Sequence, residues 1–229
     1  MTHFLSAGRV RFPRPCSTFI ARAAALIIAG AAWVASGADP LFKEDFSAVP
    51  PGNPPDGFLV LDGQFAVKDV DGNRCLELPG SPLETFGIMF GKPQLEDWGA
   101  QARIRSTGQG RRFPVFGVSV NGVGGCRLQV APARKALELL EGDEVRASVP
   151  FEWTSGSWTQ LRIQIRKDGE GWKVEGKAWK DGTAEPEKWT ITWAKTEAPI
   201  SGPAAVWGKP FSGTPIQFDD LRVWAAEKK

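Results

Sequence analysis

Short runs of alternating apolar and polar residues recur along most of the chain, and helical periodicity is almost absent. Around Ala102, for example, Ala100 and Ile104 alternate with Gln101 and Arg103. Because successive side chains of a strand point to opposite faces, such runs predict strands with one buried and one exposed face. The predicted strands span residues 41–46, 64–70, 74–78, 86–90, 98–105, 115–121, 126–131, 136–141, 145–149, 159–166, 173–179, 190–193, 204–207 and 216–224.

The number and spacing of these strands predict a single all-β domain, built as a two-sheet antiparallel sandwich. No internal repeat or low-complexity linker divides the chain. The proline-rich segment 50–55 predicts a stiff loop rather than a domain boundary, because the strand pattern resumes directly after it.

The apolar pattern also predicts the register of one hairpin. An unbroken apolar face requires Leu137 to lie opposite Val149 and Leu139 to lie opposite Ala147. This pairing predicts a turn with an odd number of residues, centred on Asp143.

The last predicted strand changes parity along its length. Phe218 lies on the apolar face, but the next apolar residues, Leu221 and Val223, are out of step with it. One extra residue within the Asp219-Asp220 pair would restore the alternation, so the sequence predicts a β-bulge there.

The N-terminal segment differs from the rest of the chain. Four arginines and no acidic residue precede a short apolar stretch, 23–35, and small residues follow it. This order is typical of a secretory signal peptide, and we predict cleavage after Ala38. We therefore expect a signal peptide at 1–38, a domain at 39–229, and a secreted or periplasmic mature chain that does not insert into a membrane. The alternative is a retained N-terminal anchor, although a span needs about 20 apolar residues.

Removal of this leader changes the net charge from +2 to −2. The mature chain then has no global positive field, so we expect no nucleic-acid partner. Tyrosine is absent, and the only histidine, His3, lies in the leader. Without an imidazole, Ser/His/Asp and Cys/His arrangements are excluded.

Two cysteines follow the leader, Cys75 and Cys126. Export to an oxidising compartment favours a disulfide. Parity argues against it, because Cys126 shares a face with Leu128 whereas Cys75 lies opposite to Leu76. The alternative to a disulfide is one buried thiol and one half-exposed thiol.

Three segments carry a family resemblance: Phe-Lys-Glu-Asp-Phe (42–46), Gly-Ser-Trp-Thr-Gln-Leu-Arg-Ile (156–163) and Ile-Gln-Phe-Asp-Asp-Leu-Arg-Val (216–223). They resemble the concanavalin A-like lectin/glucanase superfamily, in particular laminin-G-like modules of secreted bacterial proteins. The resemblance spans nearly the whole mature chain and implies a jelly roll whose first and last strands are neighbours. The superfamily contains lectins, carbohydrate-binding modules, glycosidases, polysaccharide lyases and adhesion modules, so the resemblance bears on fold more than on function.

The residues give little support to catalysis. Glycosidases of this superfamily often carry Glu-x-Asp-x-x-Glu along one strand, and this string is absent. Lyases of this fold generally use Tyr and His, which the mature chain lacks. We therefore expect a non-catalytic module, with carbohydrate or surface-glycan binding as the best specific hypothesis. Two alternatives stay open: a glycoside hydrolase with an unidentified carboxylate pair, and a purely structural envelope or interaction module.

Sugar binding requires aromatic rings and hydrogen-bonding groups, and nine of the ten tryptophans follow the leader. Trp179 is the main candidate, because it continues an outward polar series rather than the core face. Trp153 and Trp207, near predicted loops, are weaker candidates. For an anionic glycan the set adds the outward arginines, although pairing with carboxylates on a solvated sheet is their simpler interpretation. These arginines are Arg103, Arg105, Arg162 and Arg166.

The resemblance also suggests a structural calcium ion. Asp45, Asp219 and Asp220 are expected to meet where the terminal strands pair, and carboxylate oxygens are ligands that calcium prefers. The alternative is a bulge whose carboxylates bond backbone amides. We expect no other cofactor, a glycan as the partner, and a monomer.

Overall fold

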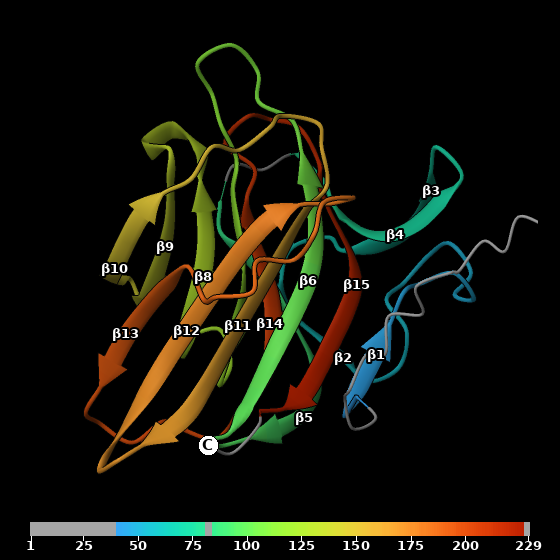
Figure 1. Ribbon diagram of the computed structural model, residues 1–229. Coiled ribbons are helices and arrows are strands. Elements are labelled where there is room, and N and C mark those ends of the chain that lie inside the picture. The colour runs from blue at the N-terminus through green and yellow to red at the C-terminus, as the bar shows by residue number, and fades with distance from the viewer. Residues whose placement is uncertain (1–39, 81–83, 227–229) are drawn as a thin grey trace, which may run out of the picture. The chain divides into compact units, whose positions relative to one another are not determined.

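The computed structural model describes residues 40–80 and 84–226. The predicted leader and its cleavage point lie outside the described residues. Two antiparallel sheets pack face to face (Figure 1). Besides strands, the described residues contain one short 3₁₀ helix, η1 (Pro132–Arg134), and no α-helix.

Sheet A lies in front in Figure 1 and has eight strands. In spatial order they are β13 (Ile191–Lys195), β12 (Gly171–Lys180), β11 (Thr159–Asp168), β6 (Trp98–Ser106), β15 (Ile216–Ala225), β4 (Asn73–Leu78) and β3 (Ala66–Val70), with β1 (Phe42–Glu44) paired to β15.

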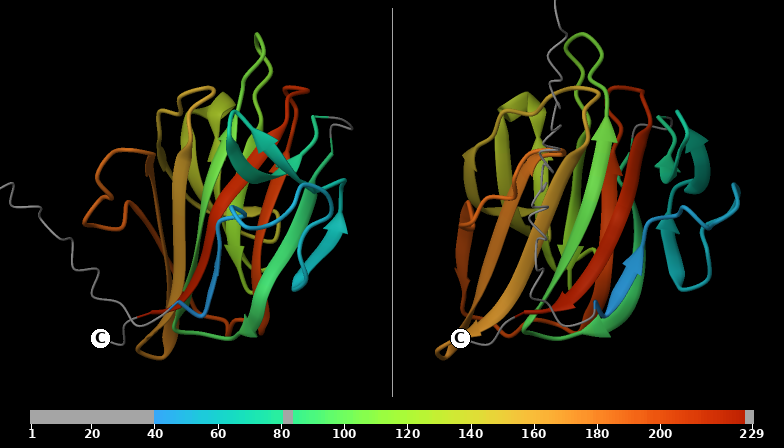
Figure 2. Two further views of the ribbon diagram at one scale, coloured as in Figure 1. Left: turned by 90° about the vertical axis from the view of Figure 1, so that its right-hand side faces the viewer. Right: turned by 45° about the vertical axis from the view of Figure 1, so that its right-hand side comes forward.

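Sheet B lies behind sheet A and has seven strands, as the rotated views of Figure 2 also show. In spatial order they are β10 (Glu144–Pro150), β9 (Ala136–Glu141), β8 (Cys126–Ala131), β7 (Val115–Val120), β14 (Gly202–Lys209), β5 (Phe86–Gln94) and β2 (Phe58–Asp62). The predicted all-β sandwich of two antiparallel sheets is confirmed.

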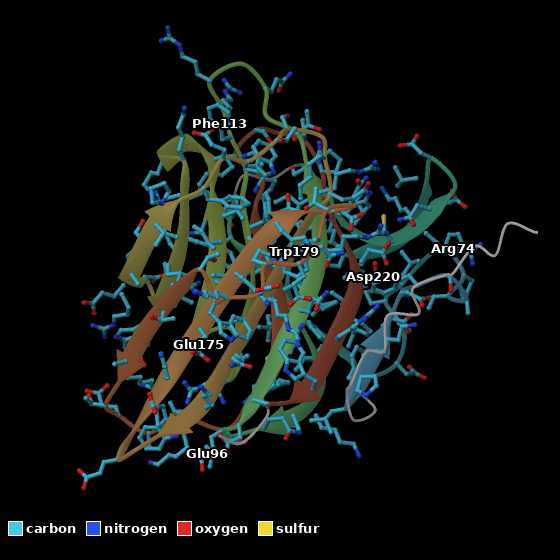
Figure 3. All side chains as sticks on the ribbon, viewed as in Figure 1. Arg74, Glu96, Phe113, Glu175, Trp179 and Asp220 are labelled. Atoms are coloured by element: carbon cyan, nitrogen blue, oxygen red, sulfur yellow. The ribbon has the colours of Figure 1, made fainter. Side chains whose placement is uncertain are left out.

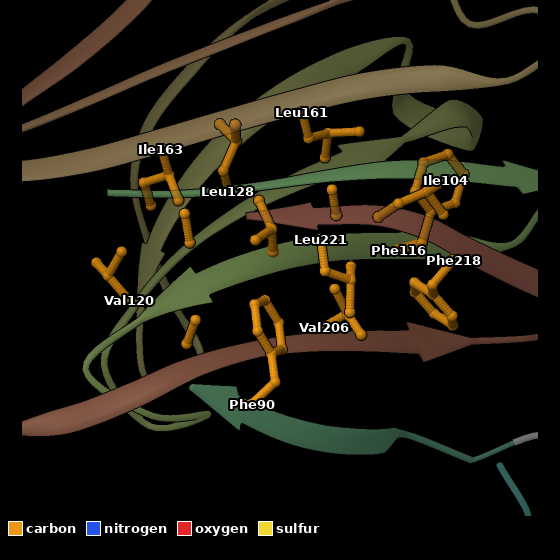
Figure 4. Packing of buried hydrophobic residues seen from close by; sticks show 14 of the residues in the cluster. Phe90, Ile104, Phe116, Val120, Leu128, Leu161, Ile163, Val206, Phe218 and Leu221 are labelled. Atoms are coloured by element: carbon orange, nitrogen blue, oxygen red, sulfur yellow. The ribbon is translucent and has the colours of Figure 1, made fainter. Parts of the chain in front are cut away.

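The core lies between the two sheets and is built from the inward residues of alternating strands (Figure 4). Ile104 and Leu161 of sheet A, and Phe116 and Leu128 of sheet B, are all fully buried. Trp98, placed on the apolar face by its parity, is 1% exposed. Period-2 alternation therefore orients the side chains as the sequence predicts.

Strand β2 is the one strand among the described residues that the sequence does not predict. Its residues Phe58, Leu59, Val60 and Leu61 form an unbroken apolar run, and three of the four are exposed. Because β2 pairs only with β5, it is an edge strand of sheet B, and its pattern has no period of two. The alternation rule therefore misses it.

The predicted apolar register of the β9–β10 hairpin is confirmed, but the predicted turn is wrong. Leu137 pairs with Val149 and Leu139 with Ala147, yet the turn between the paired residues Glu141 and Glu144 has an even number of residues. A register shift between Val145 and Ala147 supplies the missing residue. A bulge at Arg146 thus shifts the register by one residue, which is the effect that an odd turn would have had.

The predicted bulge in β15 is confirmed. The β15–β6 register shifts between Asp219 and Arg222, and Asp220 has a φ of 48°. Beyond the bulge, β1 pairs antiparallel with β15, so that Phe42 lies opposite Val223. The first and last strands are therefore neighbours, as the resemblance implies.

The two cysteines lie in different sheets and form no disulfide. Cys126 faces the core from β8, and Cys75 lies on the outward face of β4, as parity predicts. The half-exposed thiol expected at Cys75 is wrong, because this side chain is 0% exposed. Burial raises the pKa of both thiols to about 12.

Within the part of the chain that the structure describes, no helix has the length and apolar character needed to cross a membrane.

Candidate functional site

The outward side of sheet A carries the arginines that the sequence singles out. We call this surface the arginine face and define it by Arg103, Arg105, Arg162 and Arg166. All four come from β6 and β11, whose neighbouring strands present carboxylates beside them.

Arg103 is the most connected residue of the arginine face. Its guanidinium pairs with Asp219, with Asp220 at 3.2 Å and with Asp181 at 3.3 Å. It also lies over the Trp158 ring, 4.5 Å from the centroid. With three carboxylates around one guanidinium, Arg103 has no charge left to attract an anion.

Arg105 shares the same tryptophan. Its guanidinium lies 4.9 Å from the Trp158 centroid, its Nε donates to Gln217 Oε1 (2.7 Å), and it pairs with Asp71 at 3.6 Å. Trp158 therefore supports two arginines at the start of β11, in agreement with a packing role.

Arg162 and Arg166 are paired as well. Arg162 donates to Glu185 (2.8 Å) and lies 4.2 Å from the centroid of Trp224. Arg166 donates to Glu175 at 3.0 Å. Burial disfavours the charged form of Glu175, but the hydrogen bonds from Arg166 and from a neighbouring glutamine hold its pKa below the usual value.

The β12–β13 connection, residues 181–190, returns across the arginine face (Figure 1). Asp181 accepts a hydrogen bond from Gln160 (2.9 Å), and Glu185 pairs with Lys177 at 2.7 Å. Pro186 accepts a further bond from Lys177 through its carbonyl oxygen (2.7 Å). These contacts cover part of the arginine face, and they pair its cations with carboxylates of the connection.

Trp179 lies on the outward side of β12, opposite Gln160 of β11 (Figure 3). It is half-buried, which distinguishes it from the core tryptophans. Glu175 lies on the same side of the same strand (Figure 3). Trp179 thus has the orientation that the sequence predicts, beside a network of paired charges.

The three aspartates of the predicted calcium site have other partners. Asp45 pairs with Lys43 (3.2 Å), and the hydrogen bonds from Ser47 and the Lys43 cation lower its pKa to about 2. Asp219 and Asp220 hold Arg103, and burial raises the pKa of Asp220. Among the described residues, no group of three or more acidic, cysteine or histidine side chains is arranged to hold a metal ion. Calcium therefore stays a prediction from the resemblance.

The outward side of sheet B contains a cavity of about 300 Å³. We call it the Trp207 cavity. Strands β2, β5, β8 and β14 contribute to its lining, together with the β7–β8 loop and the β9–β10 turn. The lining residues are Leu61, Asp62, Thr85, Phe86, Gly87, Val123, Gly124, Arg127, Gly142, Asp143 and Trp207.

Trp207 reaches the outward side because Val206, its neighbour on β14, faces the core. Its indole lies close to two glycines on adjacent strands. A Cβ atom at Gly117 would come within 3.0 Å of Trp207 Nε1, and one at Gly87 would lie 3.7 Å from Trp207 Cβ and 3.2 Å from Val123. The small residues let a large ring lie low on the sheet, 2% exposed.

Arg127 of β8 covers the other side of this ring. Its guanidinium lies 5.0 Å from the Trp207 centroid, donates to the Gly142 carbonyl and pairs with Asp143 at 2.9 Å. Arg127 Nε and Trp207 Nε1 are both buried, and neither has an acceptor among the described residues. Six other buried side-chain atoms of the described residues also have no partner, among them Arg103 Nε and Arg162 Nε of the arginine face, so this feature does not distinguish the cavity.

Two exposed carboxylates line the cavity, Asp62 from β2 and Asp143 from the β9–β10 turn. Asp62 accepts a hydrogen bond from the Gly63 amide (2.7 Å), and no cation pairs with it among the described residues. Leu61 and Val123 supply apolar walls, whereas the Phe86 side chain belongs to the core cluster. The cavity thus combines apolar walls with two exposed carboxylates.

The sequence contained part of this site. Trp207 has the outward parity that made Trp179 the main candidate, since both alternate with core residues. Its position near predicted loops makes it a weaker candidate than Trp179 from the sequence alone. The remaining walls come from segments far apart in the sequence, such as Asp62, Val123 and Asp143, which no local pattern connects.

No protein-family model and no curated protein sequence matches this chain. Among solved structures, the chain is similar to the carbohydrate-binding module CBM66 from Bacillus subtilis, with 12% identity and a TM-score of 0.52 over 73% of this chain and 95% of that one. It is also similar to the carbohydrate recognition domain of Emp47p, with 10% identity and a TM-score of 0.57 over 84% and 99%.

A third similar structure is an immunostimulatory antigen and pseudo β-1,3-glucanase of Mycobacterium tuberculosis, with 14% identity and a TM-score of 0.52 over 83% of this chain and 100% of that one. At these identities the likeness shows the fold alone. The chain has the concanavalin A-like jelly-roll fold that its sequence predicts.

Proposed function

We propose that this chain is a secreted, non-catalytic carbohydrate-binding module that holds a sugar in the Trp207 cavity. The observation that carries the proposal is the cavity itself, whose lining combines a tryptophan ring, apolar walls and two exposed carboxylates. Ligand sites are typically concave and mostly apolar, with a few polar groups that fix the ligand, and their volumes start at about 300 Å³. A cavity of this size suits one sugar ring.

The fold likeness supports the same function by analogy. Two of the similar structures are named for carbohydrate binding or recognition, and the third is named a pseudo-glucanase. Because one fold hosts many functions, this support is weaker than the cavity itself.

The arginine face supports the proposal less well. A sugar there would meet guanidinium groups that already have carboxylate partners, and the 181–190 connection crosses it. Trp179 stays the candidate contact on this face, because it is half-buried and points outward.

Glycoside hydrolysis is the competing function, because two carboxylates, Asp62 and Asp143, line the same cavity. Hydrolysis needs one carboxyl group that is kept protonated, usually by burial. Both carboxylates are exposed, and Asp143 is paired with Arg127. These surroundings favour binding over bond cleavage.

The test is calorimetric titration of the mature domain with a panel of neutral and anionic oligosaccharides. Gly124 lines the cavity, and a Cβ atom there would meet open space. Gly124→Trp should therefore fill the cavity without strain and weaken binding about 10-fold or more, a loss of about 1.4 kcal/mol. Thr192→Trp, which adds the same ring to an exposed position of β13, is the matched control.

Trp179→Ala locates the site. Unchanged binding by this variant, together with loss in Gly124→Trp, supports the cavity. Loss in Trp179→Ala with full binding by Gly124→Trp would place the sugar on the arginine face. Absence of binding to every oligosaccharide by the folded wild-type domain refutes the proposed function.

A further inference from the structure

We infer that two copies of this chain form a dimer by pairing their β2 strands antiparallel, about a two-fold axis at Val60. The inference concerns an interaction surface and holds whether or not the Trp207 cavity binds a sugar. It differs from the monomer expected from the sequence, because residue alternation does not predict β2 and therefore gives no sign of this edge.

The backbone of β2 has a free side. β2 is the last strand of sheet B and pairs with β5 alone among the described strands (Figure 2). In an antiparallel pair, alternate residues direct their N–H and C=O groups toward the neighbouring strand, and the residues between them direct theirs away. The free side of β2 therefore presents a row of backbone donors and acceptors, which a further strand can pair with along its whole length.

The side chains of this edge are apolar. Leu59 is 57% exposed, Leu61 is 44% exposed and Val60 is 39% exposed. The register shift between Val60 and Asp62 leaves Leu61 without a residue opposite it on β5. Pairing with a second strand would remove this apolar surface from water, and contiguous exposed apolar surface of this kind is typical of interaction sites.

The strands at the other three ends of the two sheets have features that oppose such pairing. β3 presents the exposed charge of Lys68. β10 has a bulge at Arg146 and ends at Pro150. β13 ends at Lys195, a buried charged residue. β2 has a bulge as well, but it contains no lysine, arginine or proline, and its only charged residue is the last one, Asp62. β2 is therefore the least protected of the four edges.

A second copy of β2 matches this strand residue by residue. With the axis at Val60, Leu59 of one copy lies opposite Leu61 of the other, and the two Val60 residues lie opposite each other. Directly opposite residues share a face, so each apolar side chain meets another, and a slip by one residue would break the match. Asp62 lies opposite Phe58 of the other copy. The two Asp62 carboxylates are then four residues apart along the strands, about 13 Å, which exceeds the Debye length in physiological salt.

The dimer would join the two copies of sheet B into one sheet with their outward sides together. Leu61 and Asp62 of β2 line the Trp207 cavity, so the two cavities would open on the same side of the dimer. Leu59 of the other copy would lie beside Leu61 at the cavity wall. A glycan long enough to reach both cavities would bind with increased avidity, a consequence that rests on the proposed function.

Sedimentation of the mature domain over a concentration series tests the dimer. Two paired strands of five residues are small beside the roughly 800 Å² per partner of a standard interface, so we expect a dissociation constant on the order of 10 µM. Leu59→Lys places a charge on the edge at a position that is exposed in the single chain. Since each dimer contains the change twice, the dissociation constant should rise about 100-fold or more.

Val145→Lys is the matched control, because Val145 is exposed on β10, the opposite edge of the same sheet. It should leave the dissociation constant unchanged. Thermal unfolding of both variants at low concentration verifies that each single chain is folded.

A disulfide tests the register. Opposite residues of an antiparallel pair have Cα atoms about 4.5–5.5 Å apart, within the range that a disulfide spans. Val60→Cys should therefore form a covalent dimer under mild oxidation, whereas Val145→Cys should not. The native thiols of Cys75 and Cys126 are buried and do not compete.

A covalent Val60→Cys dimer, together with dissociation of Leu59→Lys, supports the inference. A wild-type chain that stays monomeric over the whole series overturns it and leaves a strand of a different protein as the occupant of this edge. Dimerisation that Leu59→Lys does not weaken also overturns it, because the interface then lies elsewhere. Dissociation of Leu59→Lys without a Val60→Cys cross-link overturns the pairing about Val60. None of these measurements uses a sugar, so their failure is distinct from failure of the proposed function.

Discussion

The arginine face and the Trp207 cavity lie on opposite outer sides of the same sandwich, and each places an arginine over a tryptophan ring. Arg103 lies 4.5 Å from the Trp158 centroid, and Arg127 lies 5.0 Å from the Trp207 centroid. On the arginine face each guanidinium has carboxylate partners within the fold. In the cavity, by contrast, Arg127 pairs with the exposed Asp143, and the exposed Asp62 has no cation partner among the described residues.

This difference teaches that residue type and outward orientation do not identify a binding site by themselves. Both surfaces have arginine, tryptophan and carboxylates. They differ in the burial of the carboxylates: Asp219 and Glu175 are buried against arginines, whereas Asp62 and Asp143 are exposed. A buried, paired carboxylate contributes to the fold, whereas an exposed one keeps lone pairs available for a ligand.

The largest expected effect comes from exchanging the two arginines for methionine, which keeps much of the side-chain volume. Arg103→Met leaves the carboxylate of Asp219, 2% exposed, buried without its cation, and we expect a loss of about 3–5 kcal/mol. Arg127→Met removes the partner of the exposed Asp143 and one donor to the Gly142 carbonyl, and we expect a loss of about 1 kcal/mol. Urea unfolding measures the loss of stability in both variants. Equal losses would contradict the difference between the arginine face and the Trp207 cavity.

An intermediate effect is expected from acid. Hydrogen bonds from Arg134 lower the pKa of Glu138 on sheet B, and those from Arg166 and Gln164 lower that of Glu175 on sheet A, although burial opposes them there. Each folded-state pKa lies below the unfolded value of about 4.3, so the stabilisation is present above that pH and is lost as the pH falls through the folded value.

The free energy of unfolding should therefore decrease as the pH falls from about 5 to about 3. Glu138→Gln and Glu175→Gln should each flatten this dependence, which unfolding curves at a series of pH values will measure. A variant with an unchanged slope shows that its carboxylate does not contribute, and would weaken the conclusion that both faces hold buried ion pairs.

The smallest expected effect concerns calcium. Arg103 already lies between Asp219 and Asp220. Removal of calcium with EDTA should therefore shift the melting temperature by less than about 1 °C, well under 1 kcal/mol for a chain of this size. A larger shift would support the metal site that the resemblance suggests. Arg103→Met frees both carboxylates, so calcium should stabilise that variant more than the wild type.

The sequence predicted those parts of the fold that depend on the parity of side chains. The apolar register of β9 and β10 and the bulge at Asp220 follow from keeping one face apolar. The same rule did not determine the β9–β10 turn, because an odd turn and an even turn with a bulge at Arg146 give the same apolar pairing. It missed β2, an edge strand with apolar residues on both sides.

The candidate site was predictable only in part. Parity indicates that Trp207 and Trp179 both face outward, but parity does not reveal which outward surface is hollow. The wall at Val123 comes from a loop that approaches Gly87, more than thirty positions earlier in the sequence. Glu185, the partner of Arg162, and Asp181, one of the partners of Arg103, likewise come from the 181–190 connection, whose path no alternation rule specifies.

The pairing of β1 with β15 has a consequence for how the chain can be rearranged. Phe42 lies opposite Val223, so the described chain enters and leaves the sandwich at one place, with paired Cα atoms about 5 Å apart. A short linker could join residues 41 and 226 and so close the chain into a ring. New ends opened in the β9–β10 turn would then give a circular permutant with the same strand neighbours.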